Sequence, residues 1–508
     1  MLMKLKWFKR VLCSCFIMLA LLVVSSASEG AIHVTVAGAG SKSGDSWTNA
    51  MSVVEFRATL QDGIEGEYWV AKGTYTPDDD SDPEKSFVLK KNIALYGGFA
   101  GTETKRDERD WETNATILSG GAVGGGDVRS YCVVRAVDVD DTAILDGFTI
   151  MAGKSTDDGG GMFIWKGSPT VTNCTFSLNE AGYGGGMYID KSNPKVSNCT
   201  FSWNKATVGG GMEITKDSSP TVTDCTFSWN KASTGGGINI ATSSPTFTNC
   251  TFSGNEASGG GGMFISNGSP TLTNCTFSRN EVNTFGGGLF IQEGDPTVTN
   301  CTFSENGANW SGGGMVIQKG DPTVTNCTFS ANEANDGGGD GMYIRDSNPT
   351  LTNSIFWRAG SAAGQIEIES GNPTITYSVV DTALFPDEGN TDADPKLGPL
   401  ADNGGSTQTC ALLEGSSAID KGLSVGPHTI DGVKIIVPGE DQRGITRPYG
   451  VGVDIGAYER DEPPFPKKPG SSGGGCATGP SSPWMLALLA PLAPIALRRR
   501  PGITIRTR

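Results

Sequence analysis

Histidine is almost absent from this chain: the 508 residues include only two, His33 and His428. They lie too far apart in sequence to suggest a shared site. Because Ser-His-Asp and Cys-His catalysis both place a histidine beside the nucleophile, the sequence argues against either arrangement. Apolar residues are also few, at 37% of the total, a share below that of a typical compact globule. A thin stacked core is therefore expected in place of a large spherical one.

Positive charge is scarce in the central part of the chain. The 39 Lys and Arg include four in residues 1–28 and five in residues 498–508, where none of the 55 Asp and Glu lies. The body between these ends therefore has a net charge near −25. Such a surface repels nucleic acid and favours loosely held divalent cations, so no nucleic-acid partner is expected.

The amino terminus has the order of a secretory signal. Four basic residues precede an apolar run over residues 11–24, and Ala27 supplies a small side chain where cleavage is expected. Residues 1–28 are thus predicted to be a signal peptide, and the rest of the chain is predicted to be exported.

The carboxyl terminus carries a second sorting pattern. A linker rich in Pro, Gly and Ser, residues 461–483, contains Cys476, and residues 484–508 form an apolar segment with a basic tail. The apolar stretch, residues 484–497, is short for a membrane span. This order resembles the bacterial Gly-Cys C-terminal sorting domains of the CTERM class, nearest to the Synerg type. The resemblance implies cleavage near Cys476, with lipid attachment and display at the cell surface or outer envelope, or release after processing; a tail-anchored helix is the alternative.

A repeat of 25 or 26 residues occupies the middle of the chain. Its clearest marker is a cysteine, and Gly147, Ser354 and Ser378 extend the series. A fixed period with glycine-rich turns is typical of stacked supersecondary units. The repeated cysteines are Cys174, Cys199, Cys225, Cys250, Cys275, Cys301 and Cys327.

Two strand signals stand in each repeat. In "GGGMFI" the first and third apolar positions stay apolar and are expected inside, whereas the middle one varies and is expected outside. In "PTVTNCTFS" Val171, Cys174 and Phe176 are all constant in type, which requires a corner at Thr172–Asn173. Each repeat is therefore one coil of about three short strands.

An asparagine follows each cysteine by five residues and predicts a stacked amide ladder. Together these patterns predict an all-β fold, a right-handed parallel β-helix with regular repeats over residues 142–380. The ladder residues are Asn179, Asn204, Asn230, Asn255, Asn280, Asn306 and Asn332.

The "GGG(M/I)xI" and "NCTFSxN" units resemble the pectin-lyase-like β-helix superfamily, in particular bacterial surface proteins with polymorphic outer-membrane-type repeats. This resemblance runs from about residue 31 to residue 380. Residues 381–460, with "DADPKLGPLADNGGSTQTC" and "VDIGAYE", resemble a choice-of-anchor Q domain. They depart from its pattern at Cys410, where a histidine is expected.

Both ends of the stack need caps, because an open coil exposes unpaired strand edges. Residues 29–141 are expected to form an N-terminal cap and irregular first coils, with an amphipathic helix over residues 46–60. Residues 381–460 are expected to close the other end as a β-rich cap.

The cysteines are best explained as buried free thiols that fill space. A column that points every side chain the same way does not converge on a metal, and coil spacing exceeds usual disulfide geometry. No metal site is assigned.

Carboxylates remain candidates: Asp157 and Asp158, and the Asp336 and Asp340 pair, flank glycine turns where they could hold calcium or act on a sugar. Solvated turn residues are the alternative. In the C-terminal region, internal ion pairs are expected, with calcium as the rival, among Asp420, Asp441, Arg443 and Asp454.

The variable outward column is the candidate ligand-binding face, because exposed aromatic residues in a line can contact a sugar or a partner. Trp203 and Trp229 add nearby apolar surface. The column is Phe163, Tyr188, Glu213, Asn239, Phe264, Phe290, Val316 and Tyr343.

The expected function is an exported, monomeric cell-surface scaffold that binds an extracellular glycan or surface protein without catalysis and without a cofactor. One alternative is a polysaccharide lyase or glycoside hydrolase that uses carboxylates on the outer face. Another is a structural spacer with no ligand. A cluster of three or more carboxylates around one concavity would favour an enzyme.

Overall fold

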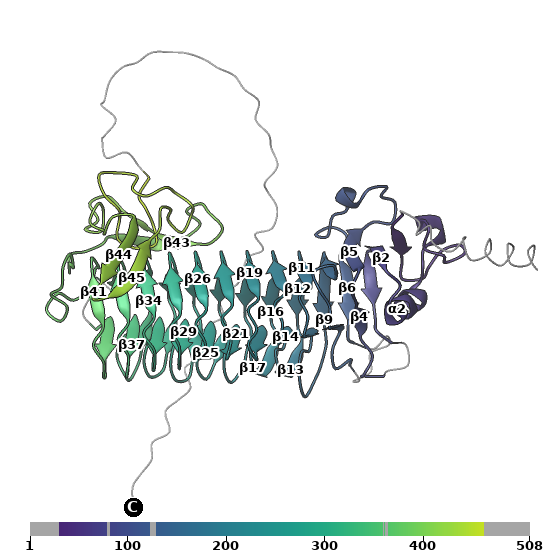
Figure 1. Cartoon of the computed structure of the whole chain (residues 1–508), viewed down its shortest axis with the longest axis horizontal. Coiled ribbons are helices and arrows are strands. Elements are labelled where there is room, and N and C mark those ends of the chain that lie inside the picture. The colour runs from purple at the N-terminus through teal and green to yellow at the C-terminus, as the bar shows by residue number, and fades with distance from the viewer. Residues whose placement is uncertain (1–29, 79–81, 122–128, 359, 361–363, 462–508) are drawn as a thin grey trace, which may run out of the picture. The chain divides into compact units, whose positions relative to one another are not determined.

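The computed structural model describes residues 30–78, 82–121, 129–358, 360 and 364–461. Parallel strands from successive coils stack into three long sheets that enclose one core (Figure 1). Sheet I has 13 strands, from β1 (Ile32–Val34) to β41 (Thr374–Thr376). Sheet II has 11 strands, from β4 (Phe87–Leu89) to β40 (Ile366–Ile368), and sheet III has 11, from β3 (Gly73–Tyr75) to β39 (Ile355–Trp357).

One coil illustrates how the repeat folds. It runs from β10 (Met162–Trp165) in sheet II through β11 (Thr170–Thr172) in sheet I to β12 (Thr175–Ser177) in sheet III. Asn173 forms the corner between the last two strands in the left-handed conformation, with φ of 52°. Val171, Cys174 and Phe176 all point into the core with exposures of 0–1%. The corner predicted from the loss of alternation is therefore confirmed.

A second corner and a fourth strand complete the coil, and the sequence did not predict them. Leu178 turns the chain with φ of 57°, after which β13 (Glu180–Tyr183) pairs with β17 (Lys205–Val208). Later coils repeat this position in β24 (Glu256–Ala257), β28 (Glu281–Val282), β32 (Gly307–Ala308) and β36 (Glu333–Ala334). These short strands, here called sheet IV, are too brief for their alternation to be visible in the sequence.

The asparagine ladder forms as expected. Asn204 Nδ2 donates to Asn230 Oδ1 at 3.0 Å and to the Phe176 carbonyl of the preceding coil at 2.8 Å. The same pattern links all seven ladder residues, from Asn179 to Asn332. The phenylalanines beside them stack from Phe176 to Phe356 with centroids 4.5–5.1 Å apart. The coils from Asn179 to Asn332 are thus tied to their neighbours inside the core.

The predicted N-terminal helix covers the first coil, but its bounds differ from residues 46–60. Trp47–Asn49 form a single 3₁₀ turn, and α2 spans Val53–Asp62. Ser52 caps its first turn and Glu55 completes a capping box, whereas Gly63 ends it in the left-handed conformation. Phe56 packs on Tyr68, Tyr75 and Phe87, which closes the core at this end.

The C-terminal region differs from the expected end cap. The final coil is closed by residues 379–391, where Val379 bridges Thr391 and Phe385 enters the core. The hairpins β42 (Leu397–Ala401) with β43 (Thr409–Leu412), and β44 (Gly426–Ile430) with β45 (Val433–Val437), follow. They lie along the side of the last coils (Figure 1). Gln442 Nε2 reaches Thr276 at 2.8 Å, and the Ala457 amide donates to Thr328 at 3.0 Å.

Two further observations bear on the predictions. Ala27, Cys476 and the apolar segment 484–497 lie outside the described residues, so the signal peptide, linker and sorting signal remain predictions. Within the described ranges, none of the helices has the length and apolar character of a membrane-spanning helix.

Candidate functional site

The variable column lies on the outer face of sheet II, in register across the coils. Phe163 pairs with Tyr188, Tyr188 with Glu213, and Glu213 with Asn239. The same register continues through Phe264, Phe290, Val316 and Tyr343. The predicted alignment is thus confirmed.

The predicted exposure of this column is wrong for most of its members. Tyr188, Glu213, Asn239, Phe290 and Val316 are buried, with exposures of 2–9%. Phe163, Phe264 and Tyr343 are half-buried.

Neighbouring members of the column pack on one another, which hides much of their surface. The rings of Phe163 and Tyr188 are stacked with centroids 5.6 Å apart, and Phe264 meets Phe290 edge-on at 4.9 Å. Sequence periodicity reports which way a side chain points; it does not report what the adjacent coils contribute.

An acidic cluster occupies the N-terminal half of this face. Asp190 lies two positions beyond Tyr188 on β14 (Met187–Asp190) and is 4% exposed. Lys216 forms an ion pair with Asp190 Oδ2 at 2.5 Å, and the Tyr188 hydroxyl lies 3.4 Å from the same oxygen. The hydrogen bond to Asp190 raises the pKa of Lys216. Burial raises the pKa of Tyr188, so its hydroxyl remains protonated.

Glu213 is the most perturbed group in this cluster. It is 4% exposed, and burial raises its pKa to about 8, opposed by a hydrogen bond from Asn239 Nδ2 to Oε1 at 3.0 Å. Its Oε2 atom, like Oδ1 of Asp190, is buried without a hydrogen-bond partner. At neutral pH Glu213 is thus mostly a neutral acid, and the Asp158 carboxylate adds to the rise of its pKa.

Of the two predicted aspartates, only Asp158 joins this cluster. It is half-buried, burial raises its pKa, and it interacts electrostatically with Asp190 and Lys216. Asp157 is exposed. Asp190 and Lys216 were missed in the sequence; alternation along β14 is the signal that places Asp190 outward beside Tyr188.

An aromatic hollow occupies the C-terminal half of the same face. A small cavity of about 50 Å³ is lined by Phe285, Phe290, Val316, Gln318, Tyr343 and Arg345. The Phe285 and Phe290 centroids are 6.0 Å apart. Gln318 and Arg345 place polar groups at its rim, and Arg345 also approaches Glu369 at 3.8 Å. Apolar walls with a few polar groups resemble the lining of a small-ligand site, but such sites enclose ~300–1,000 Å³, so a ligand can only rest on this surface.

The remaining carboxylate candidates serve the fold. Asp340 pairs with Arg358 at 2.8 Å, whereas Asp336 is exposed. In the C-terminal region Arg443 pairs with Asp441 at 2.8 Å, as expected from the sequence.

The other two aspartates singled out in the sequence, Asp420 and Asp454, accept backbone hydrogen bonds in place of the expected ion pairs. Asp420 Oδ1 accepts from the amides of Val451 and Gly452, and Asp454 accepts from those of Asp420 and Arg460. Among the residues that the structure describes, no group of three or more His, Cys, Asp and Glu side chains is arranged to hold a metal ion.

The repeated cysteines line the core and are unpaired. They are 0–1% exposed, and each thiol donates to backbone carbonyls, as Cys225 does to Thr223 at 3.2 Å. Burial raises the pKa of Cys199, Cys250 and Cys301. They are buried and free in the structure, as the space-filling interpretation expects.

Residues 138–252 and 236–384 match the family described as right handed beta helix region. The chain is a right-handed parallel β-helix. Comparison with curated proteins gives no match.

Solved β-helix structures are similar to this chain at low identity. Pectate lyase Pel9A is 14% identical with a TM-score of 0.43, over 85% of this chain and 98% of that one. PfbA, a surface adhesin of Streptococcus pneumoniae, is 11% identical with a TM-score of 0.29, over 76% and 95%. The catalytic unit of an α-1,3-glucanase from Streptomyces thermodiastaticus is 12% identical with a TM-score of 0.24, over 73% and 70%. These likenesses concern the fold alone.

Proposed function

We propose that this protein is an exported, surface-displayed β-helix that binds an extracellular polysaccharide through the outer face of sheet II. The observation that carries the proposal is the shallow hollow at the half-buried rings of Phe285 and Tyr343, which is lined also by Gln318, Arg345 and the buried Phe290. Aromatic rings stack on the apolar face of a sugar ring, and amide and guanidinium groups bond to its hydroxyls.

Asp158, Asp190 and Glu213 bring together the three carboxylates that would favour an enzyme. Their burial nevertheless fits binding without cleavage better than catalysis. The free oxygens of Asp190 and Glu213 are buried, so a substrate would have to displace neighbouring side chains to reach them. A general acid or base must come within hydrogen-bond reach of the group on which it acts.

A glycan array with the recombinant full chain, followed by affinity measurement on the best ligand, tests the proposal. Phe290→Ala with Tyr343→Ala should weaken binding about tenfold or more, since they remove two walls of the hollow. Tyr449→Ala is the matched control, because Tyr449 is 49% exposed in the C-terminal region and lines neither the hollow nor sheet IV. An array without any bound glycan would favour the spacer role, and equal affinity of both variants would place binding elsewhere.

A glycoside hydrolase is the second candidate, favoured by a neutral Glu213 and an ion-paired Asp190 on adjacent strands of sheet II. Carboxylates with opposed protonation states are the arrangement that acid-assisted glycoside cleavage needs. Analysis of the bound glycan for new reducing ends separates the two functions. If new reducing ends form with the wild-type chain and are absent with Glu213→Gln, the protein is an enzyme and the binding proposal is wrong.

Export and display rest on residues 1–28 and on the tail around Cys476. Mass spectrometry of the mature protein tests both, with a new amino terminus after Ala27 and a new carboxyl terminus near Cys476 as the expected result. An intact chain through Arg508 would refute the processing.

A further inference from the structure

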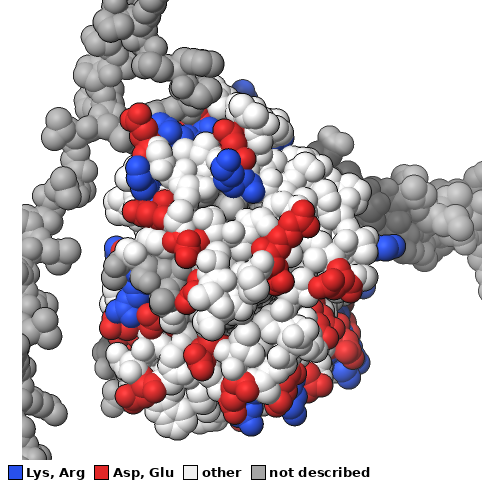
Figure 2. All heavy atoms as spheres, turned by 90° about the vertical axis from the view of Figure 1, so that its left-hand side faces the viewer, with Lys and Arg blue, Asp and Glu red and all other residues white. Residues whose placement is uncertain are grey.

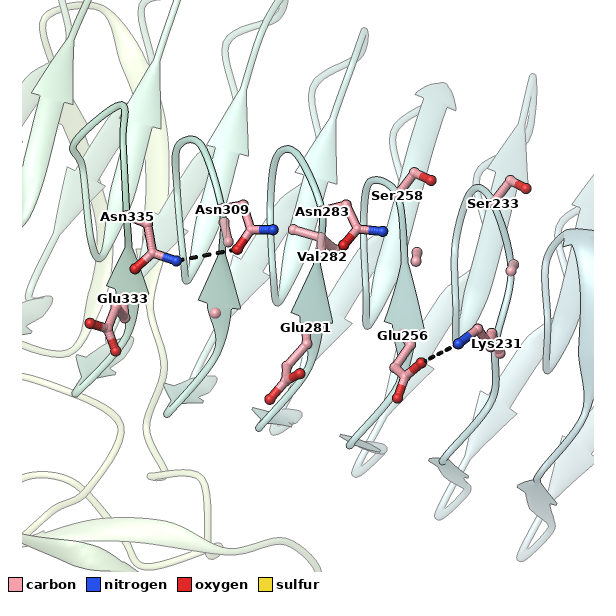
Figure 3. A pocket seen from close by; sticks show the side chains of 14 residues that line it. Lys231, Ser233, Glu256, Ser258, Glu281, Val282, Asn283, Asn309, Glu333 and Asn335 are labelled. Carbon is pink, nitrogen blue, oxygen red and sulfur yellow. Dashed lines mark hydrogen bonds and ion pairs between the residues drawn. The ribbon is translucent and has the colours of Figure 1, made fainter. Parts of the chain in front are cut away.

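The outer face of sheet IV forms a groove that is separate from sheet II. A cavity of about 700 Å³ extends across five coils, from Lys231 to Asn335. Side chains alternate along each short strand: Ala257, Val282 and Ala308 point inward and are buried. The residues on either side of them point outward into the groove (Figure 3).

Two outward rows form the floor of this groove. One row is charged and is interrupted by Gly307, where an added Cβ would meet nothing within 4 Å. The other is a row of exposed hydroxyl and amide groups, in which Asn335 donates to Asn309 at 3.2 Å (Figure 3). The charged row is Lys231, Glu256, Glu281 and Glu333, and the polar row is Ser233, Ser258, Asn283, Asn309 and Asn335.

Exposed tryptophans stand beside the groove. Trp203 and Trp229, at the corner that precedes sheet IV, are 60% and 53% exposed and are stacked with centroids 5.6 Å apart. The indole of Trp229 lies over Gly254 of the next coil, since a Cβ there would meet the ring at 2.9 Å. Gly254 therefore seats the ring flat, two residues before Glu256. Trp310, which follows Asn309, is 50% exposed.

The charge of the groove limits which polymer it accepts. Lys231 pairs with Glu256 at 2.6 Å, and Arg358 pairs with Glu333 at 2.9 Å. Glu281 remains as a further negative charge in the middle. Acidic side chains are also spread over the end face of the stack, with basic ones beside some of them (Figure 2). A polyanion such as a polyuronate would meet repulsion along this floor.

We propose that the groove is a second glycan-binding site, which takes an uncharged polysaccharide laid across successive coils. The exposed edges of Trp203 and Trp229 contact its apolar CH groups at the corner beside the groove, the serine and asparagine row bonds to its hydroxyls, and the space at Gly307 admits a substituent. At a strand spacing of about 4.8 Å, the five coils span roughly 19 Å, which suits a short run of sugars in an extended chain. The two sites have no lining residue in common, although they adjoin where Trp310 packs edge-on against Phe285 with centroids 5.2 Å apart.

Isothermal titration of the full chain with neutral hexasaccharides tests the site. The probes are cellohexaose, mannohexaose and N-acetylchitohexaose, with hexagalacturonate as the charged comparison. At least one neutral probe should bind, and Trp203→Ala with Trp229→Ala should weaken it at least tenfold. Hexagalacturonate should bind more weakly than that probe, and added salt should leave the neutral binding unchanged.

Weaker binding by the tryptophan variant could also result from misfolding, so a second variant adds a side chain to the groove. Gly307→Gln adds a side chain in open space without backbone strain, because its φ lies outside the left-handed region. It should lower the affinity at least fivefold with the unfolding midpoint unchanged. Tyr449→Ala, at a site 49% exposed in the C-terminal region, is the control that should bind normally.

Three results would overturn the proposal. They are a lack of binding by every neutral probe, unaltered affinity in both the tryptophan and the Gly307→Gln variants, and preferential binding of hexagalacturonate or a basic peptide. Loss of binding in Phe290→Ala with Tyr343→Ala alone would assign the glycan to sheet II and leave the groove empty.

Discussion

Removal of one rung from the asparagine ladder, Asn255→Ala, should destabilise the stack strongly. Asn255 is completely buried. Its Oδ1 accepts from the backbone amide of Asn230 at 3.1 Å and from Asn230 Nδ2 at 3.0 Å. Its Nδ2 donates to the Phe227 carbonyl and to Asn280 Oδ1, both at 2.9 Å. Four hydrogen bonds disappear with one side chain.

The magnitude follows from the groups left without partners. The Asn230 backbone amide and one hydrogen of its side-chain amide become buried, unsatisfied donors. Each such donor costs about 1–3 kcal/mol, so the expected loss is about 2–6 kcal/mol before any contribution from the small void. Asn280 Oδ1 is spared, since the Asn255 backbone amide still donates to it at 3.0 Å.

Urea unfolding followed by far-UV circular dichroism measures this loss. Asn283→Ala is the matched control, because its side chain is exposed and should cost no more than about 0.5 kcal/mol. Hydrogen exchange should show the weakest protection in the coils on either side of residue 255. A midpoint shift no larger than that of Asn283→Ala would refute the view that the ladder holds the coils together.

Three other changes have defined outcomes. Glu213→Gln should raise the stability at pH 9 by up to about 5 kcal/mol. The Glu213 pKa is about 8 in the folded protein and 4.5 in the unfolded chain, so the wild-type protein loses stability as the pH rises from 4.5 to 8. Urea midpoints with the same pH dependence in both proteins would contradict this. Iodoacetamide should label the core cysteines, Cys174 to Cys327, only in denaturant, and mass mapping of label in the native protein would disprove their burial. Arg447→Ala should cost about 3–5 kcal/mol by thermal unfolding, because Glu459 at 3.1 Å is left buried and unpaired; a loss below 1 kcal/mol would contradict it.

The sequence by itself determined the coil, the direction of its side chains and the ladder. In a stack, the neighbours of a residue are the residues at the same position one period away. The period therefore placed Cys174, Phe176 and Asn179 beside their counterparts, and the loss of alternation located the corner at Asn173. The same logic aligned Phe163 with Tyr188 on sheet II.

Contacts between unlike positions were decided only by the tertiary structure. Lys216 reaches Asp190 from the next coil although Asp190 is aligned with Thr215, because a long side chain can lean along the stack. The strands of sheet IV are too short to show a pattern in the sequence. The C-terminal hairpins lie along the side of the last coils, where Gln442 of the same region hydrogen-bonds to Thr276. The repeat determines which residues of the neighbouring coils align with a given residue. Only the tertiary structure determines which other side chains shield that residue from solvent.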